Sequence, residues 1–108
     1  MRRIVSFDPQ LAVLRVAGDE DRSTSGLRRR PLSAALIATR DVSVEMAELH
    51  FADPSLMLDL AVLAQRLRAD GRALCLCRPQ PQIRTLIELV GLDRLPSVAV
   101  EPLHAVGA

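Results

Sequence analysis

The sequence holds few side chains that could do chemistry, and its two cysteines are the most reactive of them. Cys75 and Cys77 are one residue apart in a strand-like segment, so both side chains should lie on the same face of a strand. Their Cα atoms would then be at or beyond the limit for a disulfide. A metal site would need two more ligands. We therefore expect two reduced cysteines in the core, with a redox or metal role as the less favoured alternative.

The remaining candidates for catalysis are two histidines and scattered acidic residues. No pair of them shows the spacing of a nucleophile and its base. We interpret His50 as structural or solvent-facing, with a role at a binding surface as the alternative, and we assign no role to His104. All 14 basic residues are arginine, which excludes a Schiff-base lysine and the lysine of a phosphate-binding loop. We expect no enzymatic activity, no cofactor and no metal.

The composition is that of one ordinary globular domain with balanced charge. The chain has 108 residues, a formal net charge of +1 and 49% hydrophobic residues, so it should fold and should not attract nucleic acid electrostatically. Tryptophan and tyrosine are absent, which removes the stacking side chains of single-strand binders. Apolar runs are too short to span a bilayer, and Asp8 precedes any run of signal-peptide length. We expect a cytoplasmic protein that neither binds nucleic acid nor inserts into a membrane.

The first elements that would position these groups are two strands. Ile4–Phe7 and Leu11–Ala17 are short apolar runs on either side of Asp8-Pro9-Gln10, a pattern typical of an antiparallel hairpin. An acidic segment, Asp19-Glu20-Asp21, comes next. A helix should follow it.

This helix is expected to lie before Ala38. The residues suited to its N-cap are Ser23, Thr24 and Ser25. Pro31 should kink the helix or make it start late, because proline is not tolerated in a helix interior. We interpret the triplet Arg28-Arg29-Arg30 as a solvated helix face, and a nucleic-acid contact is the less favoured alternative.

The middle of the chain predicts a strand followed by the best-defined helix. Val42, Val44 and Met46 alternate with smaller or polar residues, which indicates a strand ending near Met46. An ordered loop should then lead to Asp53-Pro54, a favourable N-cap and first helical residue. Asp70-Gly71 should end the helix. Its apolar stripe consists of Leu56, Leu60, Leu63 and Leu67.

The last third repeats the alternation of strand and helix. The apolar run Leu74–Cys77 suits a strand covered on both faces of a parallel sheet. A helix should begin at Pro81 and end at Gly91, a left-handed C-terminal cap. Val98–Val100 can form an edge strand. The pattern predicts an α/β fold with one mixed, mostly parallel sheet of four to five strands, packed with amphipathic helices.

From Leu11 to Val100 the chain resembles the STAS family, whose best-known members are anti-sigma factor antagonists. The segments that carry the resemblance are Leu14–Asp21, Val42–Asp53, Leu74–Pro79 and Ile83–Leu95. The last is the most specific, because it joins an amphipathic helix to Gly-Leu and a further apolar residue. The resemblance implies a single STAS-like domain over residues 1–101 and a C-terminal tail over residues 102–108.

The family's signature is Asp-Ser-Ser-Gly at the start of its second main helix. Its first serine accepts phosphate from an anti-sigma factor that is also a protein kinase. The aligned residues here are Asp53-Pro54-Ser55-Leu56. Proline has no hydroxyl, so the usual position cannot be phosphorylated, and Ser55 is left as the possible phosphorylation site.

The leading hypothesis is an anti-sigma factor antagonist-like domain that acts in regulation of transcription. It would bind a partner protein, an anti-sigma factor of the serine-kinase type, constitutively or through a different site. The main alternative is a STAS accessory subunit of a membrane lipid-transport ABC system. A small-ligand or nucleotide sensor is a third possibility.

The resemblance places partner contacts at the start of the second main helix and at the acidic turn. The predicted contact residues are Asp21, Asp53, Pro54, Ser55, Leu56 and Asp59. Asp53 would serve equally as a helix N-cap, Leu56 as a core residue and Asp21 as a plain turn residue. A phosphate on Ser55 would add negative charge near Asp53 and Asp59, so we expect it to weaken partner binding.

Overall fold

The computed structural model describes residues 5–20 and 28–101, and its centre is a five-stranded sheet. The strand order is β1-β2-β4-β6-β7. Only β1 and β2 are antiparallel; the other neighbours pair in parallel. The predicted hairpin and the mixed, mostly parallel sheet are therefore confirmed. The strands are β1 (Val5–Asp8), β2 (Val13–Val16), β4 (Val42–Glu45), β6 (Leu74–Cys77) and β7 (Val98–Glu101).

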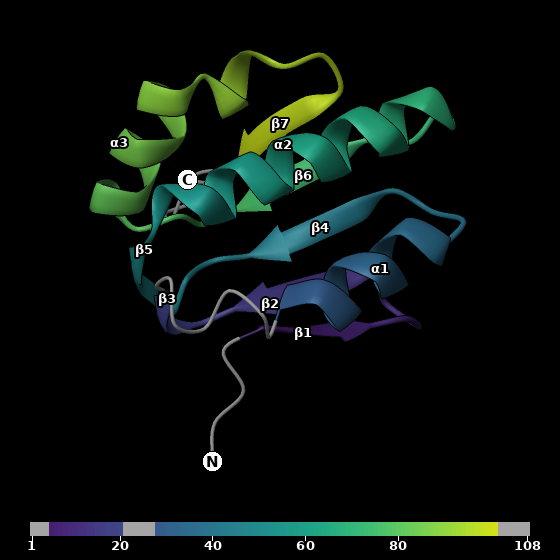
Figure 1. The fold of residues 1–108 in the computed structure, drawn as a ribbon, viewed down its shortest axis with the longest axis horizontal. Helices are drawn as coiled ribbons and strands as arrows, with labels where there is room; N and C mark the ends of the chain where they lie inside the picture. The colour runs from purple at the N-terminus through teal and green to yellow at the C-terminus, as the bar shows by residue number, and fades with distance from the viewer. Residues whose placement is uncertain (1–4, 21–27, 102–108) are drawn as a thin grey trace, which may run out of the picture.

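Within the described ranges, three α-helices form the second layer of the fold, and the core lies between this layer and the sheet. Figure 1 shows α1 (Arg29–Ile37) and α2 (Pro54–Ala69) side by side in front of the strands, with α3 (Pro81–Val90) toward one end of α2. A short 3₁₀ turn, η2 (Leu92–Arg94), follows α3. The predicted leucine stripe of α2 is confirmed, because its members are at most 2% exposed: Leu56, Leu60, Leu63 and Leu67.

The ends of the helices follow the predicted signals only in part. Asp70 caps α2, and Gly91, with φ 79°, is the left-handed cap of α3. The helix α1 starts late, as predicted, and Pro31 lies in its first turn. Its N-cap is Arg28, which makes no capping hydrogen bond with its side chain. The expected N-cap residues 23–25 and the expected tail 102–108 lie outside the described residues.

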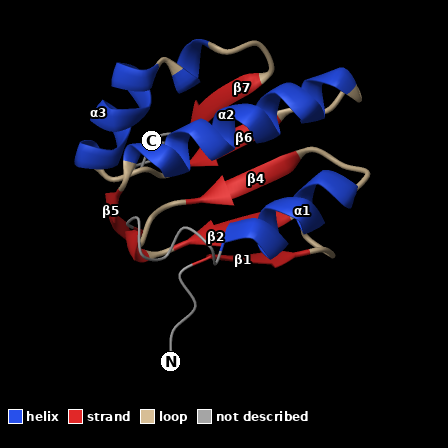
Figure 2. Cartoon of the chain, viewed as in Figure 1, coloured by secondary structure: helices blue, strands red, loops and turns tan. Residues whose placement is uncertain are grey.

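A second, two-stranded sheet corrects one prediction. Residues after Met46 were expected to form a loop, but Leu49–Ala52 is a strand, β5, that pairs in parallel with β3 (Gly18–Glu20). The Gly18 N–H donates to the Glu48 carbonyl at 2.8 Å. Figure 2 shows β5 apart from the main sheet. This pairing joins residues about thirty positions apart, so no local pattern could reveal it.

The strand β6 lies between β4 and β7, and its two faces differ. Leu74 and Leu76 are at most 1% exposed on the face packed against the core, while Cys77 is 8% exposed and Cys75 is half-buried on the other. On β4, Ser43 is half-buried too. The predicted strand is confirmed, but its second face is only partly covered.

The C-terminal end of α1 depends on a buried arginine. Arg72 follows α2 and is 9% exposed. Its guanidinium donates to the Leu36 carbonyl at 2.8 Å, to the Ala38 carbonyl, and to the exposed carboxylate of Asp70 at 3.1 Å. The last carbonyls of any helix lack partners within the helix. Arg72 supplies partners from another element and so fixes α1 in place.

Candidate functional site

The site begins at the N-terminus of α2, where Asp53 is the N-cap. Its backbone is extended, and its Oδ2 accepts a hydrogen bond from the Ser55 backbone N–H at 2.9 Å. Pro54 occupies the first helical position and is exposed. A proline loses nothing there, because its missing N–H would have had no partner in the helix. The predicted helix start is confirmed.

Replacing Asp53 by alanine is expected to cost about 0.5 to 2 kcal/mol of the free energy of unfolding, because the Ser55 N–H loses its acceptor. Asp53→Asn keeps an acceptor at the same place and should cost much less. Urea denaturation of both variants measures the difference. Equal losses for the two would show that charge, and not capping, is what Asp53 contributes.

Ser55 and Asp59 are joined by an arginine from the start of α1. Arg28 Nη2 donates to Ser55 Oγ at 2.9 Å, and Arg28 Nε lies 3.5 Å from Asp59 Oδ2. The side chain of Arg28 is 3% exposed. This corrects the interpretation of the arginine triplet as a solvated face, which holds for Arg29 and Arg30 but not for Arg28. Because α1 lies beside α2, the residue just before α1 reaches the first turns of α2.

The structure brings most of the predicted contact residues to one surface. Pro54 is exposed, and Asp53, Ser55 and Asp59 are half-buried beside it. Leu56 is 1% exposed and lies in the core. It therefore takes the role of a core residue, which was the alternative to a partner contact. Asp21 lies outside the described residues. Asp59 is paired with Arg28, so this surface is less acidic than the sequence indicates.

Exposed apolar side chains extend this surface along α2. Leu58 is 61% exposed and Val62 is 49% exposed. Together with Pro54 they are spaced by four residues, which places them on one face of the helix. Phe51, on β5 just before the helix, is 53% exposed. The sequence reasoning missed these residues; the available signal was that Leu58 and Val62 fall outside the buried leucine stripe.

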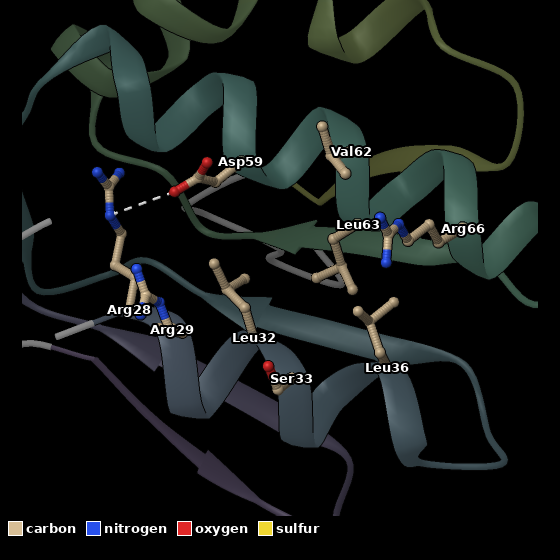
Figure 3. A pocket seen from close by; sticks show the side chains of 9 residues that line it. All are labelled: Arg28, Arg29, Leu32, Ser33, Leu36, Asp59, Val62, Leu63 and Arg66. Atoms are coloured by element: carbon tan, nitrogen blue, oxygen red, sulfur yellow. Dashed lines mark ion pairs between the residues drawn. The ribbon is translucent and has the colours of Figure 1, made fainter. Parts of the chain in front are cut away.

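A groove of about 520 Å³ lies between α1 and α2. Figure 3 shows Leu32 and Leu36 of α1 pointing toward Leu63 of α2, with the Arg28–Asp59 ion pair near one end. Two exposed arginines, Arg29 and Arg66, also line the groove, and neither has an acidic partner within the described part of the chain. Within the described residues, the groove therefore combines an apolar floor with the positive charge of Arg29 and Arg66. Its remaining lining residues are Ser33 and Val62.

The comparison with known families agrees with this fold. The sequence matches the model of the STAS domain over residues 3–104. The chain belongs to the STAS domain family. A comparison of this STAS domain with curated proteins finds no match. None of the helices in the described ranges combines the length and apolarity needed to cross a membrane.

Two solved structures share the fold of this STAS domain. One is the anti-sigma factor antagonist SpoIIAA in its unphosphorylated form, 23% identical, with a TM-score of 0.68 over 82% of this chain and 76% of that chain. The other is a chain from the crystal structure of the diguanylate cyclase SiaD in complex with its activator SiaC from Pseudomonas aeruginosa. It is 19% identical, with a TM-score of 0.65 over 91% of this chain and 89% of that chain. The predicted α/β STAS-like fold is confirmed.

The cysteines of this STAS domain lie away from the α2 surface, on the partly exposed face of β6. Both thiols are free. Burial raises the pKa of the Cys77 thiol to about 12, and the neighbouring Cys75 and the negative charge of Glu101 add to this rise. The thiolate is the reactive form of cysteine. In the absence of a metal ion, Cys77 should therefore be mostly protonated, and slow to react, near neutral pH.

A thiol reagent should accordingly react in two phases with the native, metal-free protein. Half-buried Cys75 should react first, and Cys77 much more slowly, because its protonated thiol is shielded from solvent. After unfolding without reductant, the reagent should count two free thiols. A count below two would contradict the expectation that both cysteines are reduced, and equally fast phases would contradict the burial of Cys77.

Proposed function

We propose that this STAS domain binds a partner protein of the anti-sigma factor class through the exposed start of α2, in the cytoplasm and in regulation of transcription. The observation that carries the proposal is the exposed apolar stripe of Pro54, Leu58 and Val62 beside the Arg28–Asp59 pair. Apolar side chains surrounded by polar groups are typical of the centre of a protein interface. Two structures with this fold support the proposal. The anti-sigma factor antagonist favours this class of partner, and the complex of an activator with its enzyme supports partner binding in general.

Binding is proposed to be constitutive, without phosphorylation at the family's usual position. Pro54 stands at that position by resemblance and offers no hydroxyl. Ser55 is the neighbouring hydroxyl, and its Oγ is held by the buried guanidinium of Arg28 at 2.9 Å. A kinase would have to displace this contact in order to reach the oxygen. Ser55 should therefore carry little phosphate.

Arg28 also changes the expected effect of a phosphate at Ser55. The sequence predicts that repulsion by Asp53 and Asp59 dominates. In the structure, the Arg28 guanidinium contacts the Ser55 hydroxyl at 2.9 Å and also forms an ion pair with Asp59. An arginine that faces a phosphate forms a strong charge-assisted pair. A phosphate would thus be tolerated by the domain itself. Any loss of partner affinity would come from the added bulk and charge at the interface.

Capture from native cells, followed by mass spectrometry, tests the proposal. The wild-type domain should recover an anti-sigma factor, and Leu58→Asp together with Val62→Asp should weaken the complex by about tenfold or more. The matched control is Leu89→Asp on α3, whose leucine is 76% exposed. Recovery of a transporter ATPase would favour the ABC-system alternative. Undiminished binding by the α2 variant would overturn the proposed surface.

Ser55 is tested separately with the partner so identified. Ser55→Ala should bind as well as the wild type, because the hydroxyl faces Arg28 within the domain. Phosphopeptide analysis of protein from growing and stressed cells should find Ser55 unmodified. Stoichiometric phosphate on Ser55, joined to weak binding of Ser55→Asp, would refute constitutive binding.

A further inference from the structure

The pairing of β6 with β7 brings a carboxylate to the two cysteines. In the parallel register, Cys75 is opposite Ala99 and Cys77 is opposite Glu101. The Sγ atoms of Cys75 and Cys77 are 3.4 Å apart. One ligand atom from each of Cys75, Cys77 and Glu101 lies within 4.8 Å of the others. Sequence spacing predicted no metal site because two cysteines lacked further ligands; the sheet supplies one from residue 101.

We propose that Cys75, Cys77 and Glu101 bind a thiophilic divalent metal ion, with Zn²⁺ as the best fit. Zinc is held by cysteine sulfur at about 2.3 Å and by carboxylate oxygen at about 2.0 to 2.2 Å, in tetrahedral geometry. Two sulfur ligands of a tetrahedral zinc ion are then roughly 3.8 Å apart, so the thiols need to separate only slightly. Three protein ligands leave the fourth position open to water or to a group from another molecule.

The position of the cluster allows an ion to enter from solvent. The Glu101 side chain is 40% exposed, and Cys75 is half-buried. Of the three side chains, Cys77 alone is buried, with 8% of its surface exposed. A bound ion would therefore have one buried ligand and two that face its entry path.

The charges around the cluster are compatible with a cation. Arg78 follows β6 with a φ of 55°, and its guanidinium lies between two carboxylates. It forms an ion pair with Glu45 and lies 3.7 Å from Glu101 Oε1. Glu45 remains its partner if Glu101 turns to a metal ion. When a bound ion displaces the thiol protons, two thiolates and two carboxylates carry more negative charge than one guanidinium can balance, and the divalent cation offsets the excess.

Titration of the reduced protein with Co²⁺ tests the site through its spectrum. Cobalt bound by thiolate sulfur gives an intense charge-transfer band, and this chain has only two cysteines, so such a band must come from this cluster. We expect saturation at one ion per chain. Zn²⁺ should then displace Co²⁺, remove the band and protect both thiols from a thiol reagent.

Variants assign the ligands. Cys75→Ser and Cys77→Ser should abolish the band, and Glu101→Gln should weaken Co²⁺ binding by about tenfold or more. Glu88→Gln, at an exposed position on α3, removes the same charge and should leave binding unchanged. Thermal unfolding checks that each variant is folded. Should a serine variant fail to fold, thiol protection by Zn²⁺ in the wild type still decides whether both sulfurs bind the ion.

Several results would overturn the site. Cobalt binding without a sulfur band would place the ion elsewhere, for example on a histidine. Saturation at half an ion per chain would show four sulfur ligands from two copies instead of Glu101. An unchanged affinity in Glu101→Gln would remove the carboxylate from the ligand set. None of these results bears on the α2 surface, so the two proposals fail or stand separately.

Discussion

Replacing Arg72 by alanine is expected to destabilise the domain by about 3 kcal/mol or more. The guanidinium donates to carbonyls at the end of α1, among them those of Leu36 and Ala38. Hydrogen bonds from a charged donor contribute about 1.5 to 3 kcal/mol each, and buried acceptors left without partners add to the loss. The ion pair with Asp70 should contribute little, because the Asp70 side chain is 66% exposed.

Urea denaturation of Arg72→Ala and Arg72→Lys measures this effect. Lysine keeps the charge but lacks the planar fork that reaches several carbonyls at once, so it should recover only part of the stability. Arg68→Ala, at an exposed position in the last turn of α2, is the matched control and should cost less than about 1 kcal/mol. Full recovery by lysine would mean that charge alone holds the end of α1.

The substitution Leu56→Ala should cost about 2 to 5 kcal/mol, through lost burial and the cavity left behind. Leu56 is 1% exposed, whereas Leu58, two residues along the same helix, is 61% exposed. Leu58→Ala removes the same atoms from a solvated position and should leave the free energy of unfolding within about 0.5 kcal/mol. The two variants form a matched pair for the site.

Partner binding should respond to this pair in the opposite order. Leu58→Ala should weaken binding directly, and Leu56→Ala should bind normally at temperatures where it is folded. Thermal unfolding and a binding isotherm for each variant separate the two effects. Specific loss of binding in folded Leu56→Ala would return this residue to the interface.

Periodicity in the sequence was sufficient to predict the main sheet and both long helices. The leucine stripe of α2 and the alternation in β4 are local patterns, and their buried faces agree with the structure. Asp53-Pro54 and Gly91 are equally local signals, because capping depends on a few adjacent residues.

What could not be predicted depends on contacts between residues distant in sequence. The strand β5 exists because β3 pairs with it. Arg28 looked like one member of a solvated triplet, yet it reaches Ser55 on another helix. Glu101 is joined to the cysteines only by the β6–β7 register. In each case the residue type allowed several environments, and the tertiary fold selected one.

The way α1 is attached has a consequence for local opening. Ala35 is the only residue of this helix that is fully buried, while Leu32 and Leu36 are partly covered. Arginines from outside the helix hold its two ends, with Arg28 joined to α2 and Arg72 to the last carbonyls. In native-state hydrogen exchange, the α1 amides should therefore be released by a subglobal opening, at a lower free energy than those of α2 or β6. Because part of the attachment is ionic, salt should lower that opening energy more than it lowers the energy of global unfolding.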